Sequence, residues 1–309
     1  MNWFNWRFRS SVFMLFLAVS LFSCKESEDV NFDNNDPKSP HRIATIKIEN
    51  YVNRLFIDLV GRSALDTELA AETQTLKDAN LSKTSREDLI NKLQNDTAPR
   101  VGDSSYNVAY NQRLYDVMKA RMCEGADDSE FLRYVGNANH SLKVARLNGD
   151  SIGVYAALEL IERNQNVVDG KYQLRSGDIT INQLFARMMN NNVYDNINMN
   201  TFNFVNASFD DLFSRFPTKT EFDAAYSIIQ QNKTGALLGG FASTKAEYCT
   251  LLTECDEFHE GLIRWAYISL LSREATSQDV VNHFNNLKQT KDFKQLQKEI
   301  MVTDEYADF

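Results

Sequence analysis

The chain is 309 residues long, carries 42 acidic against 33 basic side chains, and has a formal net charge of −9 at pH 7. That length is enough for one large domain or two smaller ones with a sizeable hydrophobic core. So acidic a chain repels nucleic acid and anionic lipid headgroups, and we expect neither as a partner.

The first residues have the layout of a secretory signal peptide. Arg7 and Arg9 precede an apolar run over residues 12–22, and the small Ser23 stands before Cys24. The run is too short to span about 30 Å of hydrocarbon, and no later run approaches about 18 apolar residues. We expect residues 1–23 to be removed, which would leave 286 residues with a formal charge of −11.

The sequence Leu21-Phe-Ser-Cys24 resembles the lipobox of bacterial lipoproteins. The resemblance implies cleavage before Cys24 and acylation of its sulfur and its new amino group, so the membrane is reached through an N-terminal lipid. The next five residues resemble the export signal that sends Bacteroidota-type lipoproteins to the outer face of the outer membrane. These residues are Lys25, Glu26, Ser27, Glu28 and Asp29. They also suit a solvated tether over residues 24–40, which is too polar to bury a core, and both interpretations can hold together.

One pattern occurs three times, without gaps, in the body of the chain. An aromatic residue is fifth after the first position, a leucine eighth, an arginine eleventh and an acid seventeenth. The first copy starts at Tyr51 and contains Phe56, Leu59, Arg62 and Glu68. The second starts at Phe204 and contains Phe209, Leu212, Arg215 and Glu221. The third starts at Leu262 and contains Tyr267, Leu270, Arg273 and Asp279. Three copies in register indicate an internal repeat.

Each copy predicts a helix, a turn and a second helix. Apolar residues at offsets zero, one, five and eight share one face of helix A, and Gly61 marks the turn in the first copy. Helix B opens with a capping box at Thr218 in the second copy and at Thr276 in the third. In the first copy Leu65 occupies the cap position, and we expect Asp66 to substitute for it.

The repeated arginine stands at the end of helix A, where a cation can bond exposed carbonyls and reach the acid of helix B. We therefore expect a clamp between helices A and B, formed by Arg62 with Glu68, Arg215 with Glu221, and Arg273 with Asp279. A shared anion site at the three arginines is the alternative.

A third helix, C, follows in each copy. We expect Ser85 to open it in the first copy and Thr244 in the second, while the third copy leads to Thr303-Asp-Glu-Tyr306. Between copies one and two, amphipathic helices are expected over residues 108–122 and 152–163, and a small β-hairpin over residues 167–181. The turn dipeptide Asp169-Gly170 suggests that hairpin.

The expected fold is mainly α, with three degenerate helix-turn-helix repeats, intervening helices and one small β-hairpin. The expected organisation is a signal peptide (1–23), a tether (24–40), an N-terminal helical region (41–203) that contains repeat 1 (51–95), and a C-terminal helical region (204–309) with repeats 2 and 3.

Three motifs, Leu59-Val-Gly-Arg62, Arg215-Phe-Pro-Thr with Glu221, and Thr303-Asp-Glu-Tyr306, are similar to two bacterial domains of unknown activity. One is the helical "leucine-glycine-arginine" domain of secreted and surface proteins. The other accompanies planctomycete-type cytochrome c modules. The resemblance implies an all-helical module outside the cytoplasm and supplies no catalytic residues. This chain has no Cys-x-x-Cys-His for a c-type haem.

The remaining cysteines are Cys123, Cys249 and Cys255. A disulfide between Cys249 and Cys255 is one possibility, but six residues of helix separate them by about 9 Å, beyond the Cα limit near 7 Å. Two small buried hydrophobes are the alternative. Cys255 and His259 could offer soft zinc ligands, but no fourth ligand is evident, so we expect no metal and no cofactor.

No nucleophile elbow or phosphate-binding loop occurs. We therefore expect a non-enzymatic interaction or assembly module of an envelope complex, with a protein partner. A glycan-binding lipoprotein is the first alternative, with Trp265, Tyr194, Phe202 and Phe204 as candidate sugar contacts. An enzyme with an unrecognised site is the second.

Overall fold

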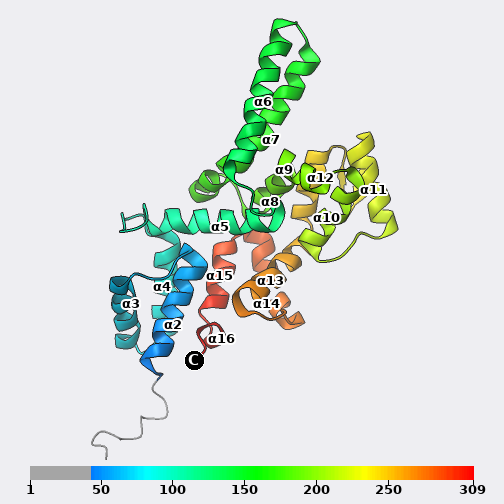
Figure 1. Cartoon of the computed structure of the whole chain (residues 1–309). Coiled ribbons are helices and arrows are strands. Elements are labelled where there is room, and N and C mark those ends of the chain that lie inside the picture. Colours follow the sequence, from blue (N-terminus) through cyan, green and yellow to red (C-terminus); the bar gives the residue numbers. More distant parts are fainter. Residues whose placement is uncertain (1–42) are drawn as a thin grey trace, which may run out of the picture. The chain divides into compact units, whose positions relative to one another are not determined.

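The computed structural model describes residues 43–309, which form one unit. Helices dominate this part of the chain, with a single two-stranded antiparallel sheet among the described residues (Figure 1). The expectation of a mainly α fold is confirmed. None of the helices described combines the length and the apolar character that crossing a membrane requires. The lipidation site at Cys24 and the export signal at residues 25–29 lie outside the described residues.

Each copy of the repeat folds as three successive helices. Copy 1 consists of α2 (Thr45–Leu55) continued by the π-helix η1 (Phe56–Val60), α3 (Asp66–Asp78) and α4 (Lys83–Asn95). Copy 2 consists of α10 (Thr201–Phe213), α11 (Lys219–Gln231) and α12 (Lys245–Glu254). Copy 3 consists of α13 (Asp256–Leu271), α14 (Ser277–Thr290) and α15 (Phe293–Met301), followed by α16 (Asp304–Ala307).

Helix A ends at the same position in all three copies. The residue before the repeated arginine is left-handed each time: Gly61 (φ 84°), Ser214 (φ 56°) and Ser272 (φ 55°). In copies 2 and 3 this residue donates its N–H to the carbonyl four residues back, whereas Gly61 donates to Phe56, five residues back. The longer span makes the last turn of copy 1 a π-helix. The arginine therefore leaves all three helices at the same point.

Helix B is capped by the repeated acid. Thr218 and Thr276 accept hydrogen bonds from the backbones of Glu221 and Asp279, whose carboxylates bond back to the threonine N–H groups. In copy 1 the N–H of Leu65 donates to Glu68 at 2.8 Å. The expectation that Asp66 caps this helix is wrong, because Asp66 is already its first helical residue.

Helix C of copy 1 begins one turn earlier than expected. Ser82 is its N-cap and accepts from the N–H of Ser85, so Ser85 lies inside the helix. In copy 2 the cap is Thr244, which accepts from Glu247.

Copy 3 lies between the other two copies. Helix α13 packs against α10 of copy 2, and α15 packs against α4 of copy 1. The last helix, α16, returns to α2: Tyr51 and Tyr306 meet edge to face at 6.0 Å, and Arg54 Nη1 donates to the Tyr306 carbonyl at 2.7 Å. The two ends of the described chain are thus joined across 250 residues.

Five helices connect copies 1 and 2. They are α5 (Tyr106–Cys123), α6 (Asp128–Leu147), α7 (Ser151–Ser176), α8 (Ile181–Met189) and α9 (Asn192–Asn198). Helices α6 and α7 pair as a long hairpin whose end extends beyond the other helices (Figure 1).

The β-hairpin expected over residues 167–181 is wrong, because α7 runs through this segment to Ser176. Val167, Val168 and Gly170 are buried on one side of the helix. A Cβ at Gly170 would lie 2.8 Å from Leu184 Cδ1, so this glycine permits close packing of α7 on α8 instead of making a turn. Tertiary packing overrides the turn preference of Asp169-Gly170.

The observed strands, β1 (Gly235–Leu237) and β2 (Gly240–Ala242), lie between helices B and C of copy 2. Their turn is formed by Leu238 and Gly239, both with positive φ (48° and 83°). Two positive φ values are what a tight hairpin turn of the mirror-image type requires.

Candidate functional site

The repeated arginines and acids are brought together in every copy. In copy 1, Nη1 and Nη2 of Arg62 donate to the two carboxylate oxygens of Glu68 at 2.7 and 2.9 Å. In copy 2, Arg215 binds Glu221 in the same two-pronged way at 2.9 and 2.8 Å. In copy 3, Arg273 Nη1 donates to Asp279 at 2.8 Å. Each contact joins the end of helix A to the start of helix B.

A second carboxylate, missed by the sequence analysis, completes each clamp. The nearest oxygen of Asp103 lies 2.6 Å from Arg62, that of Glu257 lies 2.5 Å from Arg215, and that of Glu305 lies 2.5 Å from Arg273. All three acids lie just after helix C, before or within the first turn of the next helix. The signal in the sequence is weak, because only Glu257 and Glu305 directly precede an aromatic residue.

The aromatic residue at offset five lies beneath the same guanidinium. The arginine carbon is 5.5 Å from the ring centre of Phe56, 5.1 Å from that of Phe209 and 4.9 Å from that of Tyr267. The aromatic, arginine and acid of the repeat therefore belong to one assembly, in which a cation lies over a ring between two carboxylates.

These clamps have little capacity left for a ligand. The arginine also donates to the carbonyl of the next residue, so all five N–H groups of Arg62 and of Arg215 are used. Hydrogen bonds from Arg215 lower the pKa of Glu221 to about 2. A shared anion site is not supported in these two copies, because no donor is free.

The three cysteines of the described residues, Cys123, Cys249 and Cys255, are buried, free thiols. Cys249 lies within α12 and Cys255 follows its end, so the candidate disulfide is not formed in the structure. Burial raises the pKa of Cys249 to about 12 and that of Cys255 to about 11. These thiols are small core residues in the described part of the chain, and so is Cys123.

His259 is held within the core. Its Nδ1 lies 2.8 Å from the Cys255 carbonyl oxygen and its Nε2 lies 3.2 Å from Asn182 Nδ2. Burial lowers the pKa of the imidazole. Among residues 43–309, no group of three or more His, Cys, Asp or Glu side chains is arranged to hold a metal ion.

The candidate sugar contacts are separated by the fold. Tyr194 and Phe204 are buried, and Trp265 is half-buried and stacks on Phe293 at 5.7 Å. Phe202 is 57% exposed and lies 5.0 Å from Phe222 between ring centres. Of the four aromatic residues expected to contact a sugar, only Phe202 presents its ring to solvent.

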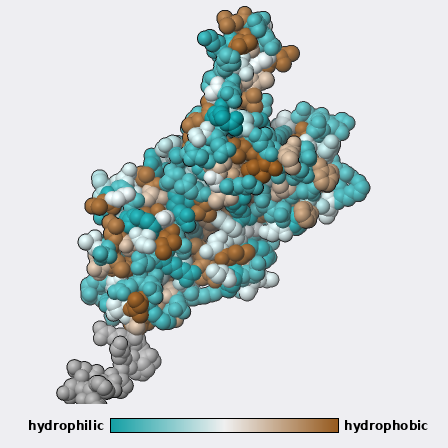
Figure 2. All heavy atoms as spheres, in the orientation of Figure 1, coloured by the Kyte–Doolittle hydropathy of each residue, from teal (hydrophilic) through white to brown (hydrophobic). Residues whose placement is uncertain are grey.

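The end of the α6–α7 hairpin is apolar and exposed. Leu147, Ile152 and Tyr155 are 78%, 82% and 75% exposed. Figure 2 shows hydrophobic residues gathered at this end. Two exposed basic residues of α6, Lys143 and Arg146, lie beside them. Exposed contiguous apolar surface with a polar rim is typical of interaction sites.

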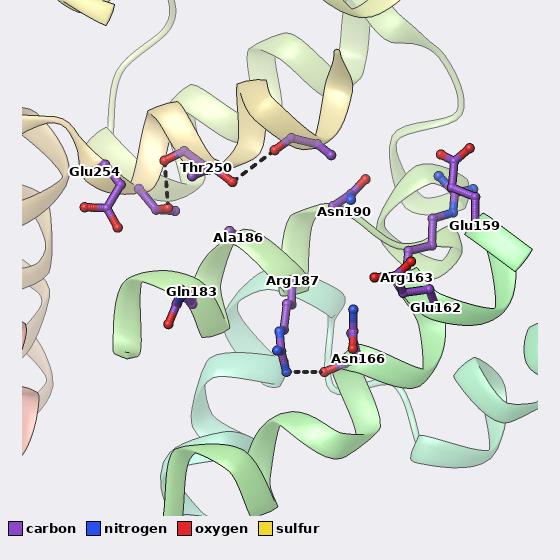
Figure 3. A pocket seen from close by; sticks show the side chains of 12 residues that line it. Glu159, Glu162, Arg163, Asn166, Gln183, Ala186, Arg187, Asn190, Thr250 and Glu254 are labelled. Carbon is purple, nitrogen blue, oxygen red and sulfur yellow. Dashed lines mark hydrogen bonds between the residues drawn. The ribbon is translucent and has the colours of Figure 1, made fainter. Parts of the chain in front are cut away.

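A polar trough lies at the base of the hairpin, between α7, α8 and α12, with a volume of about 300 Å³ (Figure 3). On α7 its lining residues are Glu159, Glu162, Arg163 and Asn166. On α8 they are Gln183, Ala186 and Arg187, followed by Asn190 at its C-cap. Each set has the spacing i, i+3, i+4, i+7, which places four residues on one face of a helix. Both stripes can be read in the sequence, but nothing in the sequence shows that they face each other across a trough.

The apolar end of the hairpin and the polar trough are features of the described residues that no packing role explains. The clamps, cysteines and His259 are accounted for by internal contacts. Comparison with known proteins adds no assignment: no family model, no curated protein and no solved structure matches this chain.

Proposed function

We propose that the protein is a lipid-anchored, non-enzymatic interaction module of the cell envelope, which binds a protein partner through the end of the α6–α7 hairpin. One observation carries the proposal, the exposure of Leu147, Ile152 and Tyr155 at the end of two long helices. Apolar side chains of this size are normally buried, and burying one contributes about 1.5–3 kcal/mol. A partner that covers all three gains that energy.

The rest of the hairpin supports the same interpretation. Leu142, Ala145 and Ala157 are buried between the two helices, so the hairpin has its own interior up to its end. Asp150 caps α7 by accepting from the N–H of Gly153 at 2.9 Å. The three exposed side chains are therefore held on a defined scaffold, which lowers the entropic cost of binding.

Charge favours an acidic partner surface. Lys143 and Arg146 are exposed next to the apolar residues, on a chain whose formal net charge is −9. Asp150, also exposed at this end, accepts the hydrogen bond that caps α7, so basic side chains outnumber acidic ones at the rim. Such a rim selects partners by charge complementarity and increases the rate of encounter. The partner would have an apolar depression with acidic residues at its edge.

An anchor at Cys24 would let the end of the hairpin point away from the membrane. The described part begins at residue 43, next to α2, and the hairpin extends from the opposite side of this unit (Figure 1). A tether of residues 24–40 reaches at most about 60 Å when fully extended. On a cell surface, the end of the hairpin could therefore contact a partner well away from the lipid.

Site-specific cross-linking in intact cells tests the interaction. A photoreactive residue at position 152 should capture one defined protein, whereas the same residue at Val281, also exposed at 64% on α14, should not. Leu147→Glu should abolish the capture at position 152 and leave the folded state intact. Equal capture at both positions, or capture that survives Leu147→Glu, would rule out the hairpin as the binding site, and so would cross-linking to lipid alone.

The location is tested separately. Cys24→Ala should release the protein from the membrane fraction. Replacement of residues 25–29 by alanines should protect the protein from protease added to intact cells. If it remains equally sensitive to the protease, these residues are not the export signal.

A glycan-binding function is a second proposal, favoured by the exposed aromatic residues of copy 2. Phe202 lies 5.0 Å from Phe222, which stacks on Tyr226 at 6.0 Å between ring centres. A row of aromatic rings can hold sugar rings by their apolar faces. Binding to a polysaccharide array that is lost in Phe202→Ala would support it, and the absence of binding to any polysaccharide would exclude it.

A further inference from the structure

The polar trough occupies positions where helices normally pack by apolar contact. Glu162 and Asn166 on α7, and Arg187 and Asn190 on α8, point into it (Figure 3). Helices of a globular protein present apolar residues at these spacings to their neighbours. Here the same spacings carry charges and amides, and the helices leave a cavity of about 300 Å³. That volume suits a small ligand and lies at the low end for ligand pockets.

Arg187 has no ion-pair partner in the trough among the described residues, although Asp169 of α7 acts on its charge from beyond ion-pair distance. Its Nη1 donates to the Asn166 carbonyl at 3.0 Å and to the Gln173 side chain, both neutral acceptors. Within residues 43–309 no carboxylate lies within ion-pair distance of this guanidinium, in contrast to the neighbouring Arg163, which pairs with Asp195 at 3.3 Å. Burial lowers the pKa of Arg187. A half-buried guanidinium with free donors is suited to bind a carboxylate.

The opposite charge lies at one end of the trough. Glu159 and Glu162 are exposed there, and neither has an ion-pair or hydrogen-bond partner among the side chains of the described residues. The third acid of the lining, Glu254, is already paired with Lys291 at 2.5 Å. Figure 3 shows Arg187 between the end that carries Glu254 and Gln183 and the end that carries Glu159 and Glu162. The unpaired charges are thus one cation and, beside it, two anions.

We propose that this trough binds a small zwitterion, a short peptide or amino acid with a free carboxylate and a free amino group. Arg187 binds the carboxylate, Glu159 and Glu162 bind the ammonium group, and the side chain of Asn190 donates to the backbone between them. A ligand with both charges suits the trough, because a lone carboxylate would lie beside two glutamates and a lone ammonium group beside Arg187. The inference is independent of the proposed function, since the trough and the end of the hairpin share no residue.

Calorimetric titration of the full-length protein with glycine, diglycine, triglycine and tetraglycine tests the proposal. The peptide whose length fits the trough should bind most tightly, and blocking either its amino or its carboxyl end should weaken its binding. For triglycine the blocked controls are N-acetyl-triglycine, which lacks the ammonium group, and triglycine amide, which lacks the carboxylate. Each blocked peptide should lose about tenfold or more in affinity, the effect of one charge-assisted hydrogen bond.

Variants assign each end of the ligand. Arg187→Gln should weaken binding of the free peptide at least about tenfold and leave binding of the peptide amide unaffected. The double variant Glu159→Gln, Glu162→Gln should weaken binding of the free peptide to the same extent and leave binding of the N-acetylated peptide unaffected. Arg175→Gln and Glu130→Gln change exposed charges outside the trough and serve as matched controls. Arg187→Lys keeps the charge and should retain part of the affinity, and circular dichroism shows that each variant is folded.

Two results would overturn the proposal. One is that no peptide of the series binds at millimolar concentration. The other is that N-acetylation, amidation and the trough variants all leave binding unchanged, because the site then recognises neither the carboxylate nor the ammonium group of the peptide.

Discussion

The repeats and the insertion between copies 1 and 2, helices α5–α9, differ in how some of their charged side chains are paired. In the repeats, every N–H group of Arg62 and of Arg215 donates to one of two carboxylates or to a backbone carbonyl. In the insertion, Arg187 meets only neutral acceptors, and Glu159 and Glu162 have no partner among the side chains of the described residues. The hairpin differs as well in gathering three large apolar side chains at its end, Leu147, Ile152 and Tyr155, each at least 75% exposed.

This difference shows which charges belong to the fold. A guanidinium between two carboxylates over a ring is satisfied internally and stabilises the junction of helices A and B. An unpaired, half-buried charge such as that of Arg187 costs free energy unless a ligand or partner supplies the opposite charge. We therefore propose that the repeats form the scaffold and that the insertion binds, and the following predictions test that division.

The largest effect is expected at the contact between copies 2 and 3. A Cβ at Gly261 would fall onto the backbone carbonyl oxygen of Leu212, so Gly261→Ala must push α13 away from α10. We expect a loss of about 3 kcal/mol in the free energy of unfolding, measured by urea denaturation. An unchanged urea midpoint would mean that copies 2 and 3 do not pack in this way.

Removal of a clamp arginine should come next. Arg62→Met leaves Glu68 and Asp103 facing each other without their cation, and both side chains are largely shielded from solvent. We expect a loss of about 2–3 kcal/mol in the same assay. Arg175→Met, at an exposed position of α7, should change the free energy by less than about 0.5 kcal/mol. Equal effects of the two changes would contradict the scaffolding role of the clamp.

The clamps should also make the protein sensitive to acid. Hydrogen bonds from Arg215 lower the folded-state pKa of Glu221 to about 2, below the unfolded value near 4.3. The unfolded chain then binds more protons between these values, so this stabilisation is complete above about pH 5 and is lost as the pH falls toward 2. Urea midpoints at pH 7, 5, 4 and 3 should fall progressively. The urea midpoint of Arg215→Met should fall less steeply with decreasing pH. An identical pH dependence in the two proteins would exclude the Arg215–Glu221 pair as the cause.

The smallest effect is expected in the hairpin, and it has the opposite sign. Gly136 lies in α6, and a Cβ there would meet no atom within 4 Å. Because alanine is the better helix former, Gly136→Ala should stabilise the protein by about 0.5–1 kcal/mol. Thermal unfolding followed by circular dichroism measures this. A loss of stability would mean that the outer face of α6 is covered, which would weaken the case for an open hairpin.

Much of the fold could be predicted from the sequence, because the relevant interactions are local. The offsets from Phe56 to Arg62 and Glu68 span one helix end and one turn, and helical periodicity with capping chemistry constrains such a segment strongly. The three helices of each copy follow from this pattern. The start of helix C in copy 1 was predicted one turn late because Ser82 and Ser85 are equally good caps by type.

Only the tertiary structure decided the rest. Asp103, Glu257 and Glu305 join their arginines from 41, 42 and 32 residues away, a distance over which no periodicity constrains the pairing. Gly170 has the sequence of a turn but lies inside α7, because its missing side chain lets α8 approach.

The same holds for the trough, which needs three helices to meet. The sequence alone determined the repeat and its chemistry, since helical geometry links residues close in the chain. The folded chain decided which charges find partners, because pairing between distant residues depends on how whole helices pack. Among residues 43–309 it left Arg187, Glu159 and Glu162 without an ion-pair partner.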